Sequence, residues 1–567
     1  MKPVLSPCAT RTVAPARVDR RSSLLAGLLA AAWMWTSFGA AAATQQEPAD
    51  SAVVRALEMH LATGSAVAAA EPPAVREFYA ARGYRPLWLG AQGVTAAAQV
   101  LVGVLASAEA EGLDPGRYAA GDPPMLSDPV GDSPALRAEQ ELQLTHAMLR
   151  YARDLAAGMV EPARLDGEYA VQPEVPDPAS ILAGASQTSD LKAYLHGFAP
   201  QRDEYRRLLA ALARYREIAA AGGWPMLPDG PMVKPGDRDG RIPRLAAHLV
   251  ATGDLPGGTS WLDDVYSLPL ANAVRRYQAR HGLHADGVLG PATLATLNVT
   301  VEQRIQVLRV NLERRRWMPH VLGERYLFVN LADFTVRAVM AGQPIFKGRL
   351  VVGATHTQTP VFTARMTYLE FNPQWAVPPS IAAREFLPKI RKDPGWLTRN
   401  HFSLLSGWAD GGTEIDPRTV DWHTVSAARF PYHLRQASGD DNALGRVKFM
   451  FPNPFNVYLH DTPAKSLFAR TVRAASHGCM RVENPLTLAE VVLAMAGNED
   501  WSREKIDETV AAGLRRSVTL RQPLPVYVGY ATAFVDATGA LQFRPDIYGR
   551  DGPLAAAMLS AARPLRR

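Results

Sequence analysis

The residues most able to do chemistry lie in the segment Ser476-His477-Gly478-Cys479-Met480-Arg481, and a second histidine, His460, precedes this segment. The thiolate is the reactive form of cysteine, and a thiol of ordinary pKa is mostly protonated at neutral pH, so a nearby base is required. The pattern therefore predicts Cys479 as a nucleophile and His460 as its base. The alternative for Cys479 is a buried, inert thiol, because free cysteines pack well in protein cores.

The neighbours of the thiol have expected roles of their own. Glycine permits a tight backbone, so N–H groups near Gly478 and Cys479 are expected to hold the oxyanion of a tetrahedral intermediate. Arg481 is expected to bind a substrate carboxylate through a bidentate pair. The alternative for Arg481 is a weak surface pair with Glu483 or another acid.

The side chains of His460 and Cys479 are expected to be positioned by β-strands. The segment Phe455–His460 alternates in polarity, and successive side chains of a strand point to opposite faces. Tyr458 and His460 are therefore expected on one face, with the apolar residues between and before them in the core. The same alternation puts Cys479 on one side together with its polar neighbours His477 and Arg481, so two polar faces are expected to converge.

From about Tyr326 onward, short runs of β-branched and aromatic residues are separated by glycine and proline. This pattern predicts a β-rich domain. Between residues 378 and 444 the pattern becomes irregular, with a helix expected over Ile381–Ile390 and a loop that carries Trp396, Trp408 and Trp422. Long ordered insertions in compact domains are often lids or binding loops. The insertion is therefore predicted to cover the catalytic groove.

Two units precede the β-rich region. Residues 44–235 have helical spacing of Ala and Leu, and their aromatic cluster of Phe78, Tyr79, Tyr84 and Trp88 is expected to be core. A proline- and glycine-rich linker follows. After it, the pattern of the segment Arg241–Asn298 predicts three short helices. Its order of His281-Gly282-Leu283, then Asp286–Gly290, then Thr293–Asn298 resembles the peptidoglycan-binding domain of wall enzymes. The alternative is a helical spacer whose glycines only make turns.

Residues 1–43 have the layout of an export signal, with a basic start, an apolar stretch over Leu24–Phe38 and small residues before residue 44. The stretch is shorter than the roughly 20 residues that cross a bilayer, so cleavage is expected, with an uncleaved N-terminal membrane anchor as the alternative. Cleavage would remove Cys8 and leave Cys479 as the one thiol. The net charge of +6 falls to +2 without the leader, and no nucleic-acid partner is predicted.

The sequence as a whole resembles the L,D-transpeptidases, in particular the large, lidded enzymes of Gram-negative bacteria. The resemblance rests first on His460 followed, after residues 461–475, by Ser476–Arg481 and Asn484. It extends to Asn311–Arg314, Val329–Phe334, Thr359–Phe362, Asn372-Pro373 with Trp375, Pro378–Ile381, Asn442–Gly445 and His460–Pro463.

The resemblance implies a two-step acyl transfer on peptidoglycan stem peptides in the periplasm. Cys479 attacks the diaminopimelate carbonyl of a tetrapeptide stem, releases D-alanine, and passes the acyl group to the side-chain amine of a second stem, which forms a 3-3 cross-link. The backbone carbonyl of Asp461 orients His460, and His477 and Ser476 support the site. Tyr458, Asn372 and Trp375 line the groove, with core packing as the alternative for Trp375. Carbapenems are expected to acylate the thiol, and other wall-synthesis enzymes and the glycan itself are expected partners.

Other functions remain open at this point. Water in place of the amine would make the chain an L,D-carboxypeptidase or a related hydrolase, and the helical and wall-binding units alone would fit a non-catalytic scaffold. A zinc peptidase would need ligands at a recognisable spacing, which His356, His423 and His433 lack. Neither a phosphate-binding loop nor a dinucleotide fingerprint is present, so no metal or other cofactor is expected.

The predicted fold is α+β and multidomain. The expected parts are a signal peptide at 1–43, a helical scaffold domain at 44–235, a three-helix peptidoglycan-binding domain at 240–300, a β-sandwich-like catalytic domain at 301–535 with the lid insertion at 378–444, and a C-terminal tail at 536–567.

Overall fold

The computed structural model describes residues 50–62, 72–90, 93–118, 133–257, 261, 263–407, 412–428 and 430–562. All of them lie in one compact unit, Pro48–Arg567. The predicted leader with Cys8, and Trp408 of the insertion, lie outside the described residues. No helix within the described ranges combines the length and apolar character needed to span a membrane.

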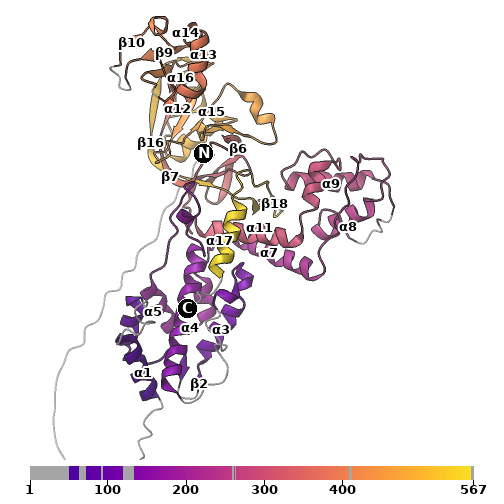
Figure 1. Cartoon of the computed structure of the whole chain (residues 1–567), viewed down its shortest axis with the longest axis vertical. Coiled ribbons are helices and arrows are strands. Elements are labelled where there is room, and N and C mark those ends of the chain that lie inside the picture. The colour runs from indigo at the N-terminus through magenta and orange to yellow at the C-terminus, as the bar shows by residue number, and fades with distance from the viewer. Residues whose placement is uncertain are drawn as a thin grey trace, which may run out of the picture. The chain divides into compact units, whose positions relative to one another are not determined.

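Helices dominate the chain before residue 221, as predicted (Figure 1). They are α1 (Asp50–Ala62), α2 (Pro73–Ala81), α3 (Ala96–Ala106), α4 (Pro134–Ala157), α5 (Pro178–Gln187), α6 (Leu191–His196) and α7 (Asp203–Ala220), with a small hairpin of β1 (Leu89–Gly90) and β2 (Gly93–Val94). Several begin with proline, whose fixed φ and missing N–H suit the first helical position.

The aromatic cluster of this region is core, as predicted, and it is organised by one buried acid. Tyr79 and Trp88 are fully buried. Glu141 of α4 accepts hydrogen bonds from the Tyr79 hydroxyl at 2.7 Å and from the backbone N–H groups of Leu87 at 2.5 Å and Leu89 at 3.1 Å. A buried carboxylate needs several donors to offset its lost hydration, and the loop before β1 supplies them.

The three helices predicted after the linker are present as α8 (Ile242–Thr252), α9 (Leu268–Arg280) and α10 (Pro291–Leu297). They enclose a separate hydrophobic cluster that includes Leu245, Leu249, Tyr277 and Leu297. Buried Gln278 fixes the glycine loop between α9 and α10, because its amide donates to the Val288 carbonyl at 3.0 Å and accepts from the Gly287 N–H at 2.8 Å. This unit therefore has its own core and its own loop scaffold.

The β-rich domain follows α11 (Val301–Arg316), which begins with a capping box of Thr300 and Gln303. Its strands are β4 (Arg325–Asn330), β5 (Thr335–Met340), β6 (Gln343–Gly353), β7 (Val361–Phe371), β12 (Val447–Met450), β13 (Leu459–His460), β14 (Ala474–Ser476), β15 (Met480–Val482) and β16 (Arg516–Gly529). The short strand β3 (Tyr169–Ala170), from the helical region, adds in parallel to β7. Helices α15 (Pro485–Met495) and α16 (Arg503–Ala511) complete the domain.

The strand pairing forms a ring instead of two separate sheets. The order is β12-β13-β15-β6-β5-β4-β16-β7, and β7 pairs again with β12 through Phe371↔Val447 and Leu369↔Phe449. Closure removes the unpaired strand edges that an open sheet leaves. The sequence predicted a sandwich-like domain because alternating burial is common to both arrangements, and only the hydrogen bonds between β7 and β12 distinguish them.

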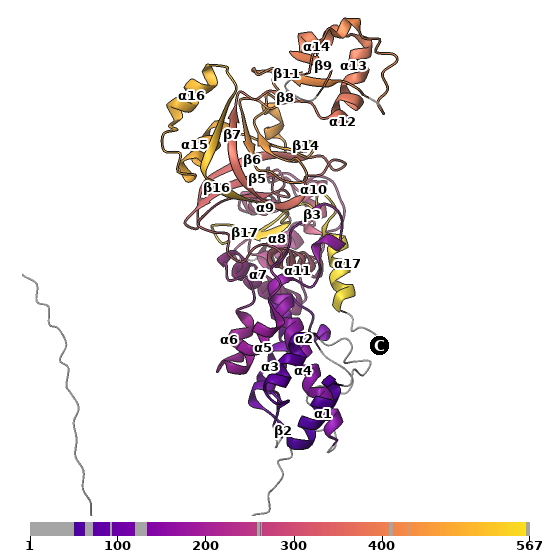
Figure 2. The same cartoon turned by 90° about the vertical axis from the view of Figure 1, so that its left-hand side faces the viewer.

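The predicted insertion forms a small subdomain (Figure 2). It contains β8 (Trp375–Ala376), α12 (Pro379–Ile381), the π-helical turn η5 (Ala382–Phe386), α13 (Leu387–Lys392), α14 (Gly395–Arg399), β9 (Phe402–Leu405), β10 (Glu414–Ile415) and β11 (His433–Gln436). The four strands pair in the order β10-β9-β11-β8. A hydrophobic cluster of its own, with Ile390, Leu404 and Leu434 at its centre, makes the insertion a folded unit.

The segment predicted as a tail is folded through residue 562. It continues the hairpin of β17 (Ala533–Val535) and β18 (Leu541–Phe543) and ends in α17 (Asp551–Ala562). The hydroxyl of Tyr548 donates to the Gly353 carbonyl at the end of β6 at 2.7 Å. The C-terminal segment is thereby attached to the sheet next to the β14 strand that pairs with β6.

Candidate active site

Cys479 lies in the tight turn between β14 and β15, and hydrogen bonds within the turn hold it. The Ser476 hydroxyl donates to the Cys479 carbonyl at 2.5 Å and accepts from the Gly478 N–H at 3.3 Å. Gly478 has a φ of 110°, a region that is costly for other residues. The buried hydroxyl of Thr359 donates to the Gly478 carbonyl at 2.7 Å. Ser476 and Gly478 therefore position the thiol, which is partly exposed.

Tyr458 is the direct neighbour of the thiol across the sheet. Strands β13 and β15 run parallel with Leu459 opposite Met480, which sets Tyr458 level with Cys479, and the Met480 N–H donates to the Tyr458 carbonyl at 3.0 Å. The Tyr458 side chain acts to lower the pKa of the Cys479 thiol. The predicted alternation is confirmed here, since Leu459 and Met480 are fully buried.

The strand predicted over Phe455–His460 is wrong in its extent, because only Leu459–His460 pairs as a strand. Asn456 has a φ of 55°, and the Asn453 side chain folds the turn by accepting from the N–H groups of Phe455 at 3.1 Å and Val457 at 3.2 Å. The turn brings the Asn456 carbonyl within 3.8 Å of the Cys479 sulfur.

His460 has the tautomer that a base requires. Its Nδ1 lies 2.5 Å from the backbone carbonyl of Asp461, so Nδ1 carries the proton and Nε2 is left as the acceptor. The Asp461 carboxylate fixes this segment by accepting from the Thr462 N–H at 2.6 Å and from the Lys465 ammonium at 2.5 Å. The expectation that the Asp461 carbonyl orients His460 agrees with this geometry.

Burial favours the neutral form of both the Cys479 thiol and the His460 imidazole. It lowers the pKa of His460 to about 3, and the positive charge of Arg481 acts in the same direction. Burial also raises the pKa of the Cys479 thiol, against the opposing hydrogen bonds of Tyr458. No hydrogen bond joins Cys479 to His460 among the residues that the structure describes. His460 lies on β13, and Cys479 lies in the turn directly before β15, the strand that pairs with β13.

Arg481 is free to bind a ligand. It lies opposite His460 in the sheet, and within the described ranges its side chain makes no hydrogen bond or ion pair. Glu483, the alternative partner considered for it, is instead bound by Arg349, whose Nε lies 2.7 Å from the carboxylate. Burial lowers the pKa of Arg481, and the nearby sulfur opposes this change.

The side chain of His477 faces the insertion and does not face His460. Its Nε2 contacts the carboxylate of Glu385 in the π-helical turn η5, and both side chains are partly exposed. π-Helical turns occur often at functional sites. The contact ties the nucleophile turn to the insertion through two residues that are far apart in the sequence.

Two residues that were predicted to line the groove, Asn372 and Trp375, pack against other parts of the protein. Asn372 is fully buried at a φ of 47°, and its amide donates to the carbonyls of Thr509 at 2.9 Å and Leu514 at 3.2 Å. These contacts give Asn372 a structural role, in which it joins the end of β7 to the segment around α16. The ring of Trp375 packs 5.9 Å from that of Phe386 within the insertion, which matches the alternative of core packing.

Lys448 is a site residue that sequence reasoning missed. It lies opposite His460 in the β12–β13 pair, and its ammonium is 4.1 Å from the centre of the Tyr458 ring. Its positive charge favours the thiolate of Cys479. The alternating polarity of Val447–Met450 is the one sequence feature that could have indicated a strand here. Only the pairing of β12 with β13 shows that Lys448 lies at the site. The part of the chain described by the structure contains no cluster of three or more His, Cys, Asp or Glu side chains arranged for a metal.

Comparisons with known proteins match this organisation. Residues 324–516 match the family model of the L,D-transpeptidase catalytic domain, residues 244–297 match the model described as "Putative peptidoglycan binding domain", and residues 73–212 match the model of a scaffold domain. A protein of Haemophilus influenzae named "Putative L,D-transpeptidase" is 35% identical over 246 residues, which are 43% of this chain and 48% of that protein. The chain thus matches about half the length of this curated relative.

Two solved structures are also similar. The L,D-transpeptidase of Stackebrandtia nassauensis is 15% identical, with 54% of this chain and 96% of that chain covered and a TM-score of 0.20. The L,D-transpeptidase of Xylanimonas cellulosilytica is 16% identical, with 53% and 98% covered and a TM-score of 0.16.

Proposed function

We propose that this chain, which carries an L,D-transpeptidase catalytic domain beside a peptidoglycan-binding domain, forms 3-3 cross-links in peptidoglycan through a thioester on Cys479. The observation that supports the proposal most directly is that a fixed turn presents a partly exposed thiol directly before β15, which pairs with the strand of a buried histidine whose Nδ1 is held by a backbone carbonyl. The cell envelope is the proposed location, because the substrate lies there and the leader has the layout of an export signal.

In the first half-reaction, the sulfur of Cys479 bonds to the diaminopimelate carbonyl of a tetrapeptide stem. The thiol proton passes to Nε2 of His460 as the bond forms, because neither group is charged beforehand. The tetrahedral intermediate then collapses, the C–N bond to the terminal D-alanine breaks, and His460 returns the proton to the departing amine. The product is an acyl-enzyme held by a C–S bond.

In the second half-reaction, the side-chain amine of another stem attacks the thioester carbonyl. A C–N bond forms, the C–S bond breaks, and the amine proton returns to the sulfur by way of His460. The charge on the carbonyl oxygen needs a donor in both halves. The Cys479 N–H is available for this, since within the described ranges it donates to no acceptor, and the free guanidinium of Arg481 is suited to a substrate carboxylate.

Hydrolysis is the second candidate function, because water and an amine compete for the same thioester. The contact between His477 and Glu385 favours amine transfer, since it sets the folded insertion against the nucleophile turn, where a lid would exclude water. Mass spectrometry of muropeptides after incubation with purified tetrapeptide substrates separates the outcomes. Dimers with 3-3 links support the proposal, whereas tripeptides alone indicate an L,D-carboxypeptidase.

The nucleophile is tested by intact-protein mass after mixing with a carbapenem. Attack on the lactam carbonyl opens the ring without a leaving group, so the protein gains the whole mass of the drug. The adduct is expected on the wild type, strongly slowed in His460→Ala and absent in Cys479→Ser. A Cys479→Ala variant that kept full cross-linking activity would favour a non-catalytic scaffold and contradict the proposal.

A further inference from the structure

Three side chains stand in one row across the sheet at the thiol site. Lys448 of β12 is paired with His460 of β13, and His460 is in turn paired with Arg481 of β15. The residues directly before and after Lys448 and Arg481 are buried. These two side chains therefore lie on the face of the sheet that points away from the core, and His460 has a cation on each side.

Neither cation has a counter-ion in the part of the chain that the structure describes. Lys448 makes no hydrogen bond or ion pair there, and its ammonium lies 4.1 Å from the centre of the Tyr458 ring. Nε of Arg481 is buried and donates to no acceptor. The Lys448 ammonium and the terminal nitrogens of Arg481 are not among the buried atoms, and both residues are partly exposed. These nitrogens are therefore open to a ligand.

The nearby acids are bound by other residues. Glu370 lies opposite Lys448 on β7, but its carboxylate accepts from Nε of Arg515 at 2.8 Å. The Asp461 carboxylate accepts from the Lys465 ammonium at 2.5 Å. The two cations beside His460 are thus left for an anion from outside the chain.

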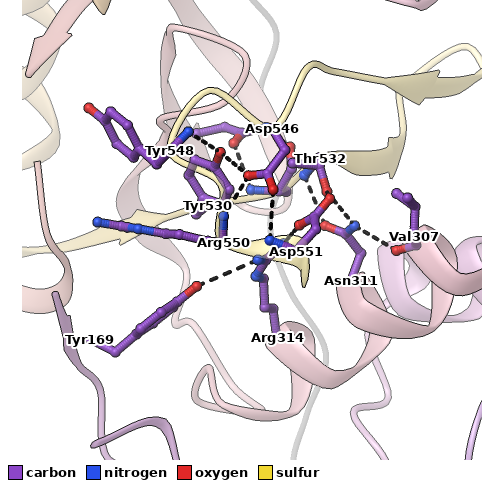
Figure 3. Close-up of polar contacts among 12 residues, drawn as sticks. Tyr169, Val307, Asn311, Arg314, Tyr530, Thr532, Asp546, Tyr548, Arg550 and Asp551 are labelled. Atoms are coloured by element: carbon purple, nitrogen blue, oxygen red, sulfur yellow. Dashed lines mark hydrogen bonds and ion pairs between the residues drawn. The ribbon is translucent and has the colours of Figure 1, made fainter. Parts of the chain in front are cut away.

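Other arginines that are largely withdrawn from solvent show how this fold normally pairs them. Arg314 donates to Asp551 at 2.5 Å in the network of Figure 3, and Arg544 donates to Asp333 at 2.5 Å. A positive charge removed from water is costly unless an anion accepts from it. Arg481 lacks the acid that the fold supplies to Arg314 and Arg544, which points to an anion that arrives with the substrate.

We infer that Lys448 and Arg481 together bind a carboxylate of the donor stem beside His460. The inference rests on the proposed function, and it adds Lys448 as a second donor to the carboxylate site of Arg481. An ammonium and a guanidinium can donate to the two oxygens of one carboxylate, and such charge-assisted hydrogen bonds are among the stronger ones. Strands β12 and β15 both neighbour β13, so their backbones lie about 10 Å apart. Two long side chains can close on one carboxylate across that distance.

The bound carboxylate also changes the charge around the base. In the proposed first half-reaction His460 accepts the thiol proton and becomes positive, and the charges of Arg481 and Lys448 oppose that step. A carboxylate held by both residues offsets this opposition, because a nearby negative charge favours the protonated imidazole. The donor stem thereby assists the proton transfer that begins its own acylation.

The test measures kcat and KM for acyl-enzyme formation by the full chain with synthetic tetrapeptide donor stems. One stem keeps all of its carboxylates. Two others carry an amide in place of one carboxylate, either at the terminal D-alanine or at the diaminopimelate side chain. Carbapenem acylation of the wild type, followed by intact mass, reports separately whether the proposed function holds.

On the wild type, one of the two amidated stems is expected to have a KM raised roughly tenfold or more, because a charge-assisted hydrogen bond is lost. The kcat for that stem is expected to fall as well, since both cations beside the base stay uncompensated. The stem that shows this loss identifies the bound carboxylate. Equal kcat and KM for all three stems would overturn the inference without any variant.

Lys448→Met removes the charge but keeps a long apolar side chain, and Lys448→Arg keeps the charge. Lys448→Met is expected to raise the KM for the unmodified stem by roughly tenfold and to cause no further loss with the amide that identifies the site. Lys448→Arg is expected to restore most of the affinity. An equal loss for every stem in Lys448→Met would show a lysine that only positions Tyr458, and the inference would be wrong.

Lys347→Met is the matched control, because Lys347 is an exposed strand lysine on β6 that is paired with Arg337 of β5. It is expected to leave kcat and KM unchanged for every stem. If Lys448→Met and Lys347→Met both act on every stem as the wild type does while carbapenem acylation proceeds, Lys448 does not bind the stem and the proposed function stands.

Discussion

The neutral state of Cys479 leads to a specific pH dependence of its reactivity. Burial raises the pKa of the thiol above its ordinary value of 9.0. At pH 7, a thiol with that pKa or a higher one is at most about 1% thiolate, and the fraction grows about tenfold for each pH unit. We therefore expect the rate of alkylation by iodoacetamide to rise about a hundredfold between pH 6 and pH 8, without a plateau.

The assay needs one thiol and one inactive control. The chain has two cysteines, so a Cys8→Ser background confines alkylation to Cys479, and adding Cys479→Ser should abolish it. Intact mass at several times and pH values gives the rate. His460→Gln is expected to leave the alkylation profile nearly unchanged, because the pKa of His460 is lowered to about 3 and the imidazole is already neutral across this range.

Carbapenem acylation should respond differently to the same variant. The attack on a carbonyl needs the proton removed during the reaction, so the loss of the base is expected to slow acylation by roughly 10²–10⁴-fold. A plateau of alkylation below pH 7 would instead indicate a preformed thiolate and imidazolium pair. That result, or a collapse of alkylation in His460→Gln, would refute the assignment of neutral groups.

Four further predictions follow from individual contacts. Gly478→Ala is expected to strain the turn by roughly 1–3 kcal/mol and to abolish acylation, whereas Gly539→Ala, also at positive φ but in the distant β17–β18 hairpin with open space around it, should lower the melting temperature and leave acylation intact. Tyr458→Phe removes the hydroxyl that lowers the pKa of the thiol, so alkylation at pH 7 should slow several-fold; an unchanged rate would exclude that hydrogen bond. Glu385→Gln should alter stability by less than about 1 kcal/mol, because the contact is exposed, yet raise the ratio of hydrolysis to cross-linking in muropeptide analysis; an unchanged ratio would argue against a lid that His477 anchors. Asn372→Ala should cost about 1–3 kcal/mol in denaturant unfolding, because the buried Thr509 carbonyl and the Leu514 carbonyl lose their donor, while the KM for the stem stays the same; a raised KM at full stability would assign Asn372 to the groove.

Local patterns were enough to single out Cys479 and His460 as candidate reacting groups. A cysteine after Ser476-His477-Gly478, with a histidine upstream on an alternating segment, is a combination that packing alone does not require. Helical spacing identified the region before residue 221, and turn residues identified the three helices around Gly282 and Gly287. These features depend on neighbours within a few residues, so the sequence displays them directly.

Side-chain hydrogen bonds to the backbone, which no sequence pattern displays, explain where the structure departs from the expectations. The extent of the strand before His460 was wrong because the side chain of Asn453 competes for the backbone of the same segment. Asn372 stood in a recognisable motif, but its partners Thr509 and Leu514 are more than a hundred residues away in the chain. No periodicity reports such a contact.

The sequence by itself singled out Cys479 and His460 as the candidate nucleophile and base and gave the order of the folded units, because these follow from residue type and short spacing. The tertiary structure alone decided that the strands close into a ring, that the Asn456 carbonyl lies beside the sulfur, and that Lys448 lies opposite His460 in the sheet. Those outcomes depend on strand register and on contacts between remote segments, where burial and hydrogen-bond geometry select one of many pairings that the same local patterns allow.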